Sequence, residues 1–361
     1  MKIIGCDIGT MFCVCAKQLD DEKIEVTSMR NMFLPITDDM VNITEMSNTN
    51  INYVEAKDDI DGSSSLYIIG EDSYKFANIF NQKVKRPMSK GVISSSEIDA
   101  LDVLTLMMEK LVGGTTKGGY CVYSVPAAAI DIEIPPVLYH EKVFGMIFSK
   151  LGYTAIPLNE AMAIIYSECQ KEKFSGIACS FGAGLTNIVC AYKGAPTLAF
   201  AVSRAGDWVD QNVSSSLNII PNRITAIKEK EGLDLMNPVC ANKKERRVRS
   251  AISFYYRELI EYVLKVIINK FNDNADGLNI SEKIPIIVSG GTSKPIGFLD
   301  MFKDVFNNTK DFPYEISEIR QAKDPLHAVA EGSLLYAMWN QKRKGNIDDN
   351  DTERKKEEKN K

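Results

Sequence analysis

Two short stretches of the sequence decide the fold. Residues 3–16 read IIGCDIGTMFCVCA, and residues 175–192 read SGIACSFGAGLTNIVCAY, about half a chain length later. Each consists of an apolar run, a turn that contains glycine, and a second apolar run, which is the pattern of two strands joined by a tight turn. One hairpin of this kind is common and carries little information. Its repetition halfway along the chain predicts a duplicated α/β fold with two facing lobes.

The rest of the chain alternates expected strands and helices, which predicts a mixed sheet flanked by helices in each lobe. Short apolar runs that end at glycine or proline predict strands, and apolar residues at helical spacing predict helices. Beyond the two hairpins, the expected strands are residues 67–70, 120–125 and 284–289. The expected helices are residues 97–112, 137–151, 159–171, 251–271 and 328–339.

Composition narrows the classes of function. The chain has 361 residues and a formal net charge of −5, so it lacks the positive field that attracts nucleic acid, and we expect no direct binding to nucleic acid. Two histidines are too few for a three-histidine zinc site. Eight cysteines without a C-x-x-C pair indicate buried free thiols in a reducing compartment. The start lacks a secretory signal and no run of about 18 residues is apolar, so we expect a cytoplasmic chain without a transmembrane segment.

The glycine turns predict a clamp for phosphates. Glycine has no Cβ, so backbone N–H groups in such a turn can approach an anion closely. Asp7, at the end of the first strand, could hold Mg²⁺ through water, and Thr10 adds a hydroxyl donor. Gly182, Gly184 and Thr186 would supply the second half of the clamp.

A third glycine motif follows a buried strand. Gly290, Gly291 and Thr292 precede an expected helix, and their bare backbone could lie against a flat base or a ribose. The sequence therefore predicts a nucleotide cleft between the two lobes.

Five motifs, taken in order, carry a family resemblance. They are DIGT at 7–10, GAGLTN at 182–187, AGDWVD at 205–210, AIKEK at 226–230 and VSGGTSKP at 288–295. Their joint order and spacing resemble the superfamily of actins, DnaK-type chaperones and sugar kinases, which are ATPases. Within it, the chain most resembles the bacterial actins of the MreB and MamK kind.

The resemblance implies ATP and Mg²⁺ as cofactors and gives roles to individual residues. Asp7 would be the carboxylate on the metal side, and Glu160 would place the attacking water. The residues that would hold phosphates are Gly9, Thr10, Gly182, Ala183, Gly184, Leu185 and Thr186. Those that would line the nucleoside are Gly206, Lys228, Glu229, Gly290, Gly291 and Thr292. From the residues alone, Lys228 and Glu229 equally fit a solvated helix face, and Glu160 fits a helix N-terminus favoured by the helix dipole.

The chain departs from the family pattern at both phosphate motifs. The second motif normally opens with an aspartate, and this position is Ser180. Serine forms hydrogen bonds but cannot act as a carboxylate base, and the loss of one positioned catalytic group costs on the order of 10²–10⁴ in rate. In the first motif, Met11 and Phe12 replace the small polar residues of the chaperone pattern, which leaves fewer phosphate donors. We therefore expect nucleotide binding with slow or absent hydrolysis.

Two functions fit the sequence. The first is a cytoskeletal protein that binds ATP in the interlobe cleft and polymerises with itself, with adaptor proteins as further partners. The alternative is a nucleotide-dependent scaffold or regulator of the same fold that does not polymerise. A DnaK-type chaperone would need a substrate domain, and a sugar kinase would need a base that faces a sugar pocket; the sequence predicts neither.

The expected division of the chain follows from the duplication. Lobe I takes residues 1–165, with a small subdomain at about 31–85, and is completed by a C-terminal helix at about 324–340. Lobe II takes residues 166–323, with a small subdomain at about 207–250. The polar segment 36–66 is expected at a lobe tip, where it would make longitudinal filament contacts. The charged residues 341–361 are expected to form a disordered tail, solvated in preference to holding a partner.

Overall fold

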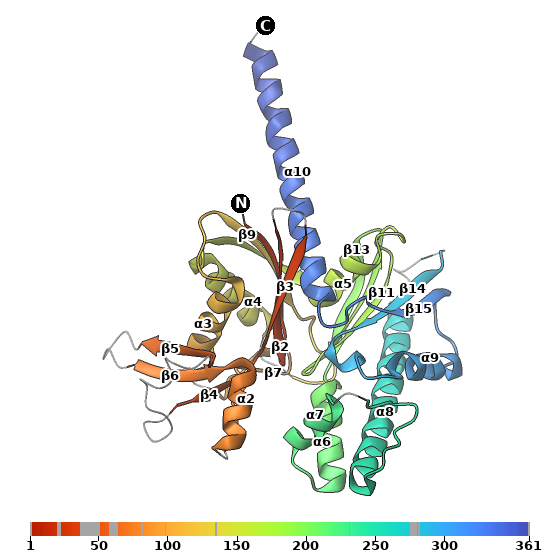
Figure 1. The fold of residues 1–361 in the computed structure, drawn as a ribbon. Helices are drawn as coiled ribbons and strands as arrows, with labels where there is room; N and C mark the ends of the chain where they lie inside the picture. The colour runs from red at the N-terminus through yellow and green to blue at the C-terminus, as the bar shows by residue number, and fades with distance from the viewer. Residues whose placement is uncertain are drawn as a thin grey trace.

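Two lobes stand side by side in this protein, and the last helix rises between them (Figure 1). The computed structural model describes residues 2–19, 23–36, 51–57, 64–80, 82–97, 99–133, 136–230, 232–274, 280 and 282–359. Each lobe is built around one five-stranded sheet. We call the lobe around the N-terminal sheet lobe I and the other lobe II.

The sheet of lobe I has the strand order β10-β9-β1-β2-β3. Strands β1, β2 and β3 form an antiparallel meander, whereas β9 runs parallel to β1 and β10 runs parallel to β9. The strands are β1 (Ile3–Ile8), β2 (Phe12–Gln18), β3 (Ile24–Arg30), β9 (Gly119–Val125) and β10 (Tyr153–Asn159).

The sheet of lobe II repeats this arrangement with the order β13-β12-β11-β14-β15. Again three strands form an antiparallel meander, and two further strands join in parallel on the other side of the first. The strands are β11 (Gly176–Phe181), β12 (Thr186–Tyr192), β13 (Ala195–Val202), β14 (Ile284–Ser289) and β15 (Ile316–Gln321). The predicted duplicated fold, with a mixed sheet in each lobe, is confirmed.

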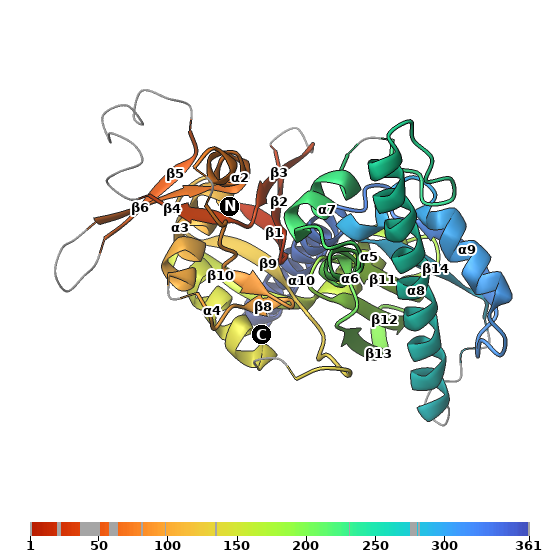
Figure 2. The same ribbon diagram turned by 90° about the horizontal axis from the view of Figure 1, so that it is seen from below.

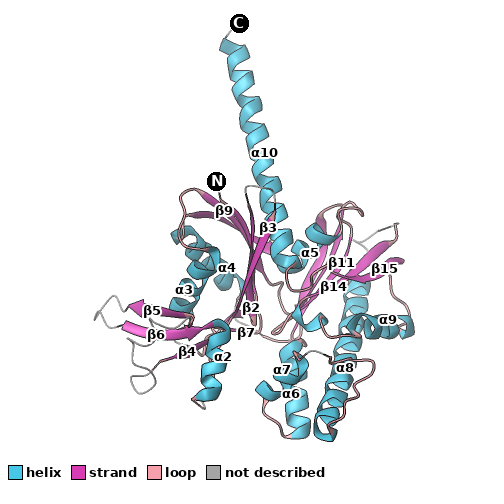
Figure 3. Ribbon diagram, viewed as in Figure 1, coloured by secondary structure: helices cyan, strands magenta, loops and turns pink. Residues whose placement is uncertain are grey.

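Helices cover both sheets and close the two cores (Figure 3). In lobe I the core fills between the sheet and the helices α3 (Ala100–Val112) and α4 (Val137–Lys150). In lobe II it fills between the sheet and the helices α8 (Lys243–Asp273) and α9 (Phe298–Asn308). The long helix α8 begins eight residues before the expected start at 251, because Asn242 caps it with its side chain.

A smaller unit extends from each lobe beside the cleft (Figure 2). In lobe I it contains the sheet β4-β6-β5, helix α2 (Gly70–Ile79) and the short hairpin of β7 (Met88–Ser89) and β8 (Val92–Ile93). The three strands are β4 (Phe33–Pro35), β5 (Tyr53–Lys57) and β6 (Ser64–Ile69). Most of the segment 36–66, for which we expected longitudinal contacts, lies outside the described residues. In lobe II the unit holds α6 (Gly206–Leu217) and α7 (Pro221–Lys228) beside α8.

The helices that end the two halves of the chain pack on the opposite sheets. Helix α5 (Glu160–Glu168) follows the last strand of lobe I, yet its residues 161–165 pack against Ala178 and Val189 of the lobe II sheet. Helix α10 (Ala328–Lys359) follows the last strand of lobe II, and its Ala330 packs against Val14 of the lobe I sheet. The exchange links the lobes at the base of the cleft.

The C-terminal segment differs from the expected disordered tail. Helix α10 continues to Lys359 and projects beyond the body of the molecule (Figure 1). This segment is rich in lysine, arginine and glutamate, which have high helix propensity, and a solvated helix needs no core to satisfy its backbone hydrogen bonds. The charged composition therefore did not predict the backbone conformation of this segment. Of the helices described, none has the length and apolar character needed to cross a membrane.

Candidate functional site

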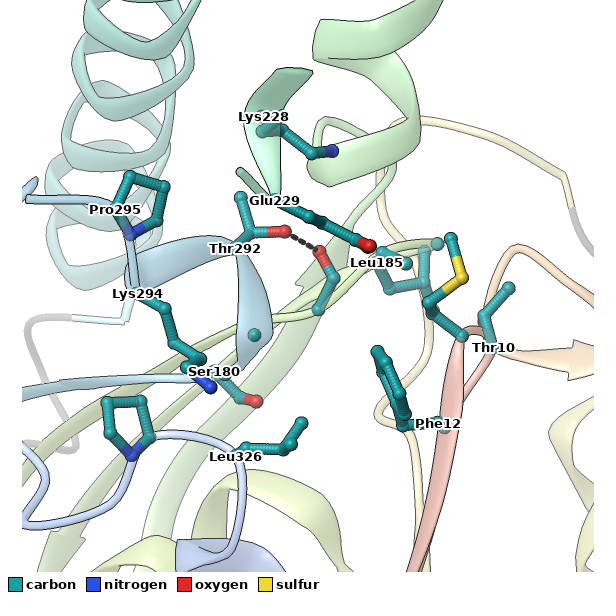
Figure 4. Close-up of a pocket in the computed structure, with 18 of the residues that line it drawn as sticks. Thr10, Phe12, Ser180, Leu185, Lys228, Glu229, Thr292, Lys294, Pro295 and Leu326 are labelled. Carbon is teal, nitrogen blue, oxygen red and sulfur yellow. Dashed lines mark hydrogen bonds between the residues drawn. The ribbon is translucent and has the colours of Figure 1, made fainter. Parts of the chain in front are cut away.

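A cavity of about 620 Å³ lies where the turns of the two hairpins face each other. In Figure 4, Thr10 and Phe12 lie on one side of it, and Lys228, Glu229, Thr292 and Pro295 lie on the other. The cavity brings together every residue predicted for the site except Thr186 and Gly206. Residues from both halves of the chain therefore form one site.

The first hairpin turns tightly between Ile8 and Cys13. The backbone N–H of Gly9 donates to the carbonyl oxygen of Phe12 over 3.0 Å. A Cβ on Gly9 would lie 2.5 Å from that oxygen, which is closer than real Cβ contacts allow, so the turn requires glycine. The hydroxyl oxygen of Thr10 accepts a hydrogen bond from the N–H of Gly91 over 3.0 Å.

Asp7 brings a carboxylate to the floor of the cavity at the end of β1. Ser124 donates its hydroxyl to Asp7 Oδ1 over 2.9 Å and accepts from the N–H of Ile8 over 2.8 Å, so the carboxylate is held by its neighbouring strand. Burial raises the pKa of Asp7, and the hydrogen bond from Ser124 offsets this in part. A nearby cation would favour the charged form.

The second hairpin repeats the turn of the first. The N–H of Gly182 donates to the carbonyl oxygen of Leu185 over 3.0 Å, and a Cβ on Gly182 would lie 2.8 Å from that oxygen. A Cβ on Gly184 would lie 2.6 Å from Thr10 Oγ1, so this turn lies directly against the first. Ala183 also lines the cavity. The two hairpins thus place two glycine-containing turns around one space.

Thr186 does not contribute to the cavity. Its hydroxyl donates to the carbonyl oxygen of Arg204 over 2.8 Å, and its side chain is buried in the sheet. Alternation along β12 explains this placement, because neighbouring strand residues point to opposite faces. The next residue, Asn187, lines the cavity instead, and the sequence analysis missed it.

Glu160 is held by two donors from the second hairpin. Ser180 donates its hydroxyl to Glu160 Oε1 over 2.7 Å, and Asn187 donates its amide to Oε2 over 2.9 Å. Burial raises the pKa of Glu160, the charge of Asp7 raises it further, and the two donors lower it. Glu160 is the first residue of α5 and also lines the cavity. Its position is therefore compatible both with a helix N-terminus and with a site residue.

Ser180 contributes a neutral donor to the site. Its hydroxyl occupies one oxygen of Glu160. Among the described residues that line the cavity, Asp7 and Glu160 are the two buried carboxylates.

The third motif forms the opposite wall. Gly290 has a φ of +89°, and a Cβ there would collide with the backbone of Phe181, so only glycine lets β14 lie this close to β11. The hydroxyl of Thr292 donates to the carbonyl oxygen of Gly182 over 2.7 Å, which ties this motif to the second hairpin. Gly206 lies behind Thr292, since a Cβ on Gly206 would meet the Thr292 hydroxyl.

Lys228 lines the cavity, but its charge is already paired. Its ammonium contacts Asp210 Oδ2 at 2.8 Å, and the exposed fractions of the two side chains are 10% and 4%. It also donates to the carbonyl oxygen of Gly206 over 3.3 Å. The solvated helix face is therefore excluded for Lys228, which braces α7 against α6 through these contacts.

Glu229 reaches the cavity and also a partner that the sequence analysis did not identify. Its carboxylate contacts the guanidinium of Arg30, from β3 of lobe I, at 2.8 Å. No local motif marks Arg30, because its partners lie far along the chain.

The donor set fits a polyanion with one bound cation. The turns present backbone N–H groups, and Lys230 and Lys294 add positive charge at the cavity wall. Among the described residues, no cluster of three or more histidine, cysteine, aspartate or glutamate side chains could hold a metal by itself. Mg²⁺ needs no such cluster, because it retains waters and takes further oxygens from phosphates. Asp7, whose pKa is raised by burial and lowered only in part by the hydrogen bond from Ser124, fits this type of ion.

Comparison with known proteins decides the family. The model of one family, described as Volactin, matches residues 1–337. The chain belongs to the Volactin family. No curated protein sequence matches it.

Solved structures match this Volactin chain along most of its length. MreB5 of Spiroplasma citri bound to AMPPNP is 14% identical, with a TM-score of 0.64, and the match covers 96% of this chain and 98% of that one. The MamK double helical filament is 16% identical, with a TM-score of 0.63 and coverage of 93% and 98%. The ethanolamine utilization protein EutJ from Carboxydothermus hydrogenoformans is 16% identical, with a TM-score of 0.54 and coverage of 93% and 90%. The chain therefore has the actin-like fold, and the predicted resemblance to MreB and MamK is confirmed.

Proposed function

We propose that this Volactin-family protein is a cytoplasmic, actin-like cytoskeletal protein that binds ATP with Mg²⁺ between its lobes. One observation carries the proposal: two glycine turns from repeated hairpins and the Gly290–Thr292 segment converge on a single cavity. The volume, about 620 Å³, suits a ligand of nucleotide size. Structures of MreB5 with ADP and with AMPPNP share the fold, which supports a nucleotide as the ligand.

In this proposal the cavity residues divide into three groups. The turns at Gly9–Thr10 and Gly182–Leu185 hold the phosphates through backbone N–H groups. Gly290–Thr292 lies against the nucleoside. Asp7 holds Mg²⁺ through water, and the ion neutralises charge on the phosphates. Lys228 acts indirectly, because its contacts with Asp210 and Gly206 fix the wall on which the nucleoside lies.

We further propose that hydrolysis is slow or absent. Glu160 is placed to orient a water, but both of its carboxylate oxygens already accept hydrogen bonds from Ser180 and Asn187. A neutral Ser180 hydroxyl cannot take a proton from water in the way a carboxylate base does.

Polymerisation is the second part of the proposal. Its support is the shared fold with the MamK double helical filament, together with MreB5. Nucleotide bound between lobes would bias their closure and thereby the surfaces that subunits present to one another.

Calorimetry tests the binding step. We expect ATP with Mg²⁺ to bind the purified chain, and Gly290→Ala to lose binding. The matched control is Gly114→Ala, because Gly114 has a φ of +87°, close to the +89° of Gly290, but no atom within 4 Å of an added Cβ. The control keeps binding, although it too places a Cβ on a residue with a positive φ. Absence of heat with adenine nucleotides in the wild type, with a normal melting transition, contradicts the proposal.

Steady-state phosphate release tests the catalytic claim. We expect a slow wild-type rate, and an increase of roughly tenfold or more in Ser180→Asp, since a positioned catalytic group contributes 10²–10⁴ in rate. A fast wild-type rate that Ser180→Asp leaves unchanged contradicts the role given to Ser180.

Sedimentation and electron microscopy, with and without ATP and Mg²⁺, test polymerisation. Filaments that depend on nucleotide support the cytoskeletal function. A monomer under all conditions that still binds ATP favours the non-polymerising scaffold or regulator.

A further inference from the structure

An arginine of lobe I crosses the mouth of the cleft. Arg30 is the last residue of β3, in lobe I. Its Nη2 contacts Glu229 Oε2 at 2.8 Å, directly after α7, and its Nε contacts Glu71 Oε2 at 2.7 Å, in the first turn of α2. The Arg30 side chain is only 10% exposed, although Glu229 and Glu71 are 37% and 54% exposed. One guanidinium therefore joins lobe II to the small unit of lobe I.

The first phosphate turn forms the seat of this arginine. The guanidinium carbon of Arg30 lies 4.7 Å from the centre of the Phe12 ring, within range of a cation–π interaction. Its Nη1 lies 3.4 Å from Met11 Sδ. Met11 and Phe12 are the two residues that depart from the small polar residues of the family motif, and both line the cavity. Their apolar side chains have a function as support for Arg30 that phosphate binding alone does not explain.

A second ion pair crosses on the same side. Arg86, just before β7 of lobe I, donates from Nη1 to both carboxylate oxygens of Asp207, at 3.0 and 2.8 Å. Asp207 follows Gly206 at the start of α6. Both cross-lobe pairs thus end on residues that adjoin positions predicted to line the nucleoside.

We propose that Arg30, seated on Phe12, is a gating and positioning residue that holds the cleft closed over the nucleotide and orients Glu229 toward it. The proposal rests on the proposed function for its ligand. β3 and α7 belong to different lobes, so the Arg30–Glu229 contact must break when the lobes separate. Nucleotide release then requires this contact to break first.

The Arg257–Asp304 pair provides a matched control. Arg257 Nη1 contacts Asp304 Oδ2 at 2.8 Å, the same distance as in the gate. Both residues lie in lobe II, on α8 and α9, so lobe separation leaves their contact intact. Arg257→Ala removes an ion pair of equal length without touching the cleft.

The first measurement needs no nucleotide. Spin labels on native Cys240 in lobe II and on Ile79→Cys in α2 report the distance between the lobes. Cys240 is the one cysteine that is not buried, and Ile79 is 69% exposed, so both positions accept a label. In this background, Arg30→Ala shifts the distance distribution to longer values, and Arg257→Ala leaves it as in the parent.

The second measurement is the release rate of a fluorescent ATP analogue. Arg30→Ala raises this rate about fivefold to tenfold, the range expected for a partly buried ion pair with a cation–π contact. Arg30→Lys, which keeps the charge and loses the planar fork, gives an intermediate rate. Wild-type release accelerates with salt because salt screens the cross-lobe ion pairs, and this salt dependence is weaker in Arg30→Ala, in which only the Arg86–Asp207 pair remains. Arg257→Ala keeps both the rate and the salt dependence of the wild type.

Two results separate the possible failures. If Arg30→Ala changes neither the interlobe distance nor the release rate, the gate is overturned. If the wild type binds no adenine nucleotide, the proposed function fails. The gate is then judged from the nucleotide-free interlobe distances alone: a longer distance in Arg30→Ala supports it, and an unchanged distance overturns it.

Discussion

The two lobes share one backbone plan but carry different chemistry on it. Both hairpins turn at a glycine whose N–H bonds a carbonyl three residues on, Gly9 to Phe12 and Gly182 to Leu185. At the matching position before the turn, lobe I has Asp7 and lobe II has Ser180. Within the turn, lobe I has Met11 and Phe12 where lobe II has Gly184 and Leu185. In the strand that follows, lobe I has Cys13 and Val14 where lobe II has Thr186 and Asn187.

The difference teaches which part of the repeat is constrained. In both lobes the first residue of the turn, Gly9 or Gly182, has no room for a Cβ, so the backbone geometry requires glycine there. The flanking side chains meet different neighbours and serve different tasks: lobe I brings a carboxylate and a seat for Arg30, and lobe II brings donors that hold Glu160.

The largest effect is expected from the shared backbone. Gly9→Ala and Gly182→Ala each place a Cβ under 3.0 Å from a carbonyl oxygen, at 2.5 and 2.8 Å. We expect each to lower the free energy of unfolding by about 2–4 kcal/mol and to reduce ATP affinity on the order of 100-fold, with Gly9→Ala the more severe. Urea unfolding and calorimetry measure the two effects. If one of the two variants behaves as the wild type, the hairpins are not equivalent.

A buried histidine distinguishes lobe I at low pH. His140 of α4 is fully buried beside Phe144, and neither ring nitrogen has a hydrogen-bond partner among the described residues. Burial lowers its pKa to about 4 from the ordinary 6.5. Below pH 6.5 the unfolded chain binds a proton that the folded chain refuses, so this group lowers stability as pH falls from 6.5 to 4, by up to about 3 kcal/mol.

The test of this effect is the pH dependence of unfolding in His140→Leu. We expect this variant to lose less stability than the wild type between pH 7 and pH 4.5. His327→Gln is the control, since His327 is partly exposed and paired with Asp324 at 2.9 Å. Parallel pH curves for His140→Leu and the wild type would show that His140 is not buried as described.

A substitution at Ser180 tests the difference between the two hairpins, because the matching position in lobe I is Asp7. Ser180→Asp places a negative charge where Ser180 Oγ now lies 2.7 Å from Glu160 Oε1. Without nucleotide and Mg²⁺, we expect a loss of about 2 kcal/mol in the free energy of unfolding, because two buried carboxylates repel each other. Ser180→Asn, which is similar in size but uncharged, separates charge from size. Equal stability of the two variants would contradict the electrostatic account.

The smallest effect concerns tyrosine hydroxyls in the two cores. Tyr256 of lobe II is fully buried and lines the cavity, and its hydroxyl has no partner among the described residues. Tyr123 of lobe I is also buried, but its hydroxyl donates to the carbonyl oxygen of Glu141 over 2.8 Å. We expect Tyr256→Phe to stabilise the nucleotide-free protein by about 1 kcal/mol and Tyr123→Phe to destabilise it by a similar amount. Thermal unfolding decides this, and the same sign for both variants would refute the contrast.

The sequence by itself determined the duplication and the glycine turns, and all of its predicted site residues except Thr186 and Gly206 line the cavity. Strand alternation of apolar and polar residues, turn residues and the helical spacing of apolar residues each involve only a few neighbouring residues, so they can be recognised in the sequence. The prediction was wrong for the charged segment after residue 340. A charged composition is compatible with a disordered tail and with a solvated helix, and in the structure the segment extends helix α10. The prediction was also wrong at Thr186, where the register of β12 turned the side chain into the sheet and brought Asn187 to the cavity.

Only the tertiary structure decided which groups meet across the cleft. Arg30 and Glu229 are 199 residues apart in the chain, and no local pattern encodes their contact. The same holds for the packing of α5 on the sheet of lobe II, and for the pairing of Lys228 with Asp210 in place of a solvated face. Such contacts depend on how the lobes pack. A charged side chain that becomes buried must be paired, and its partner is whichever opposite charge the fold places nearby.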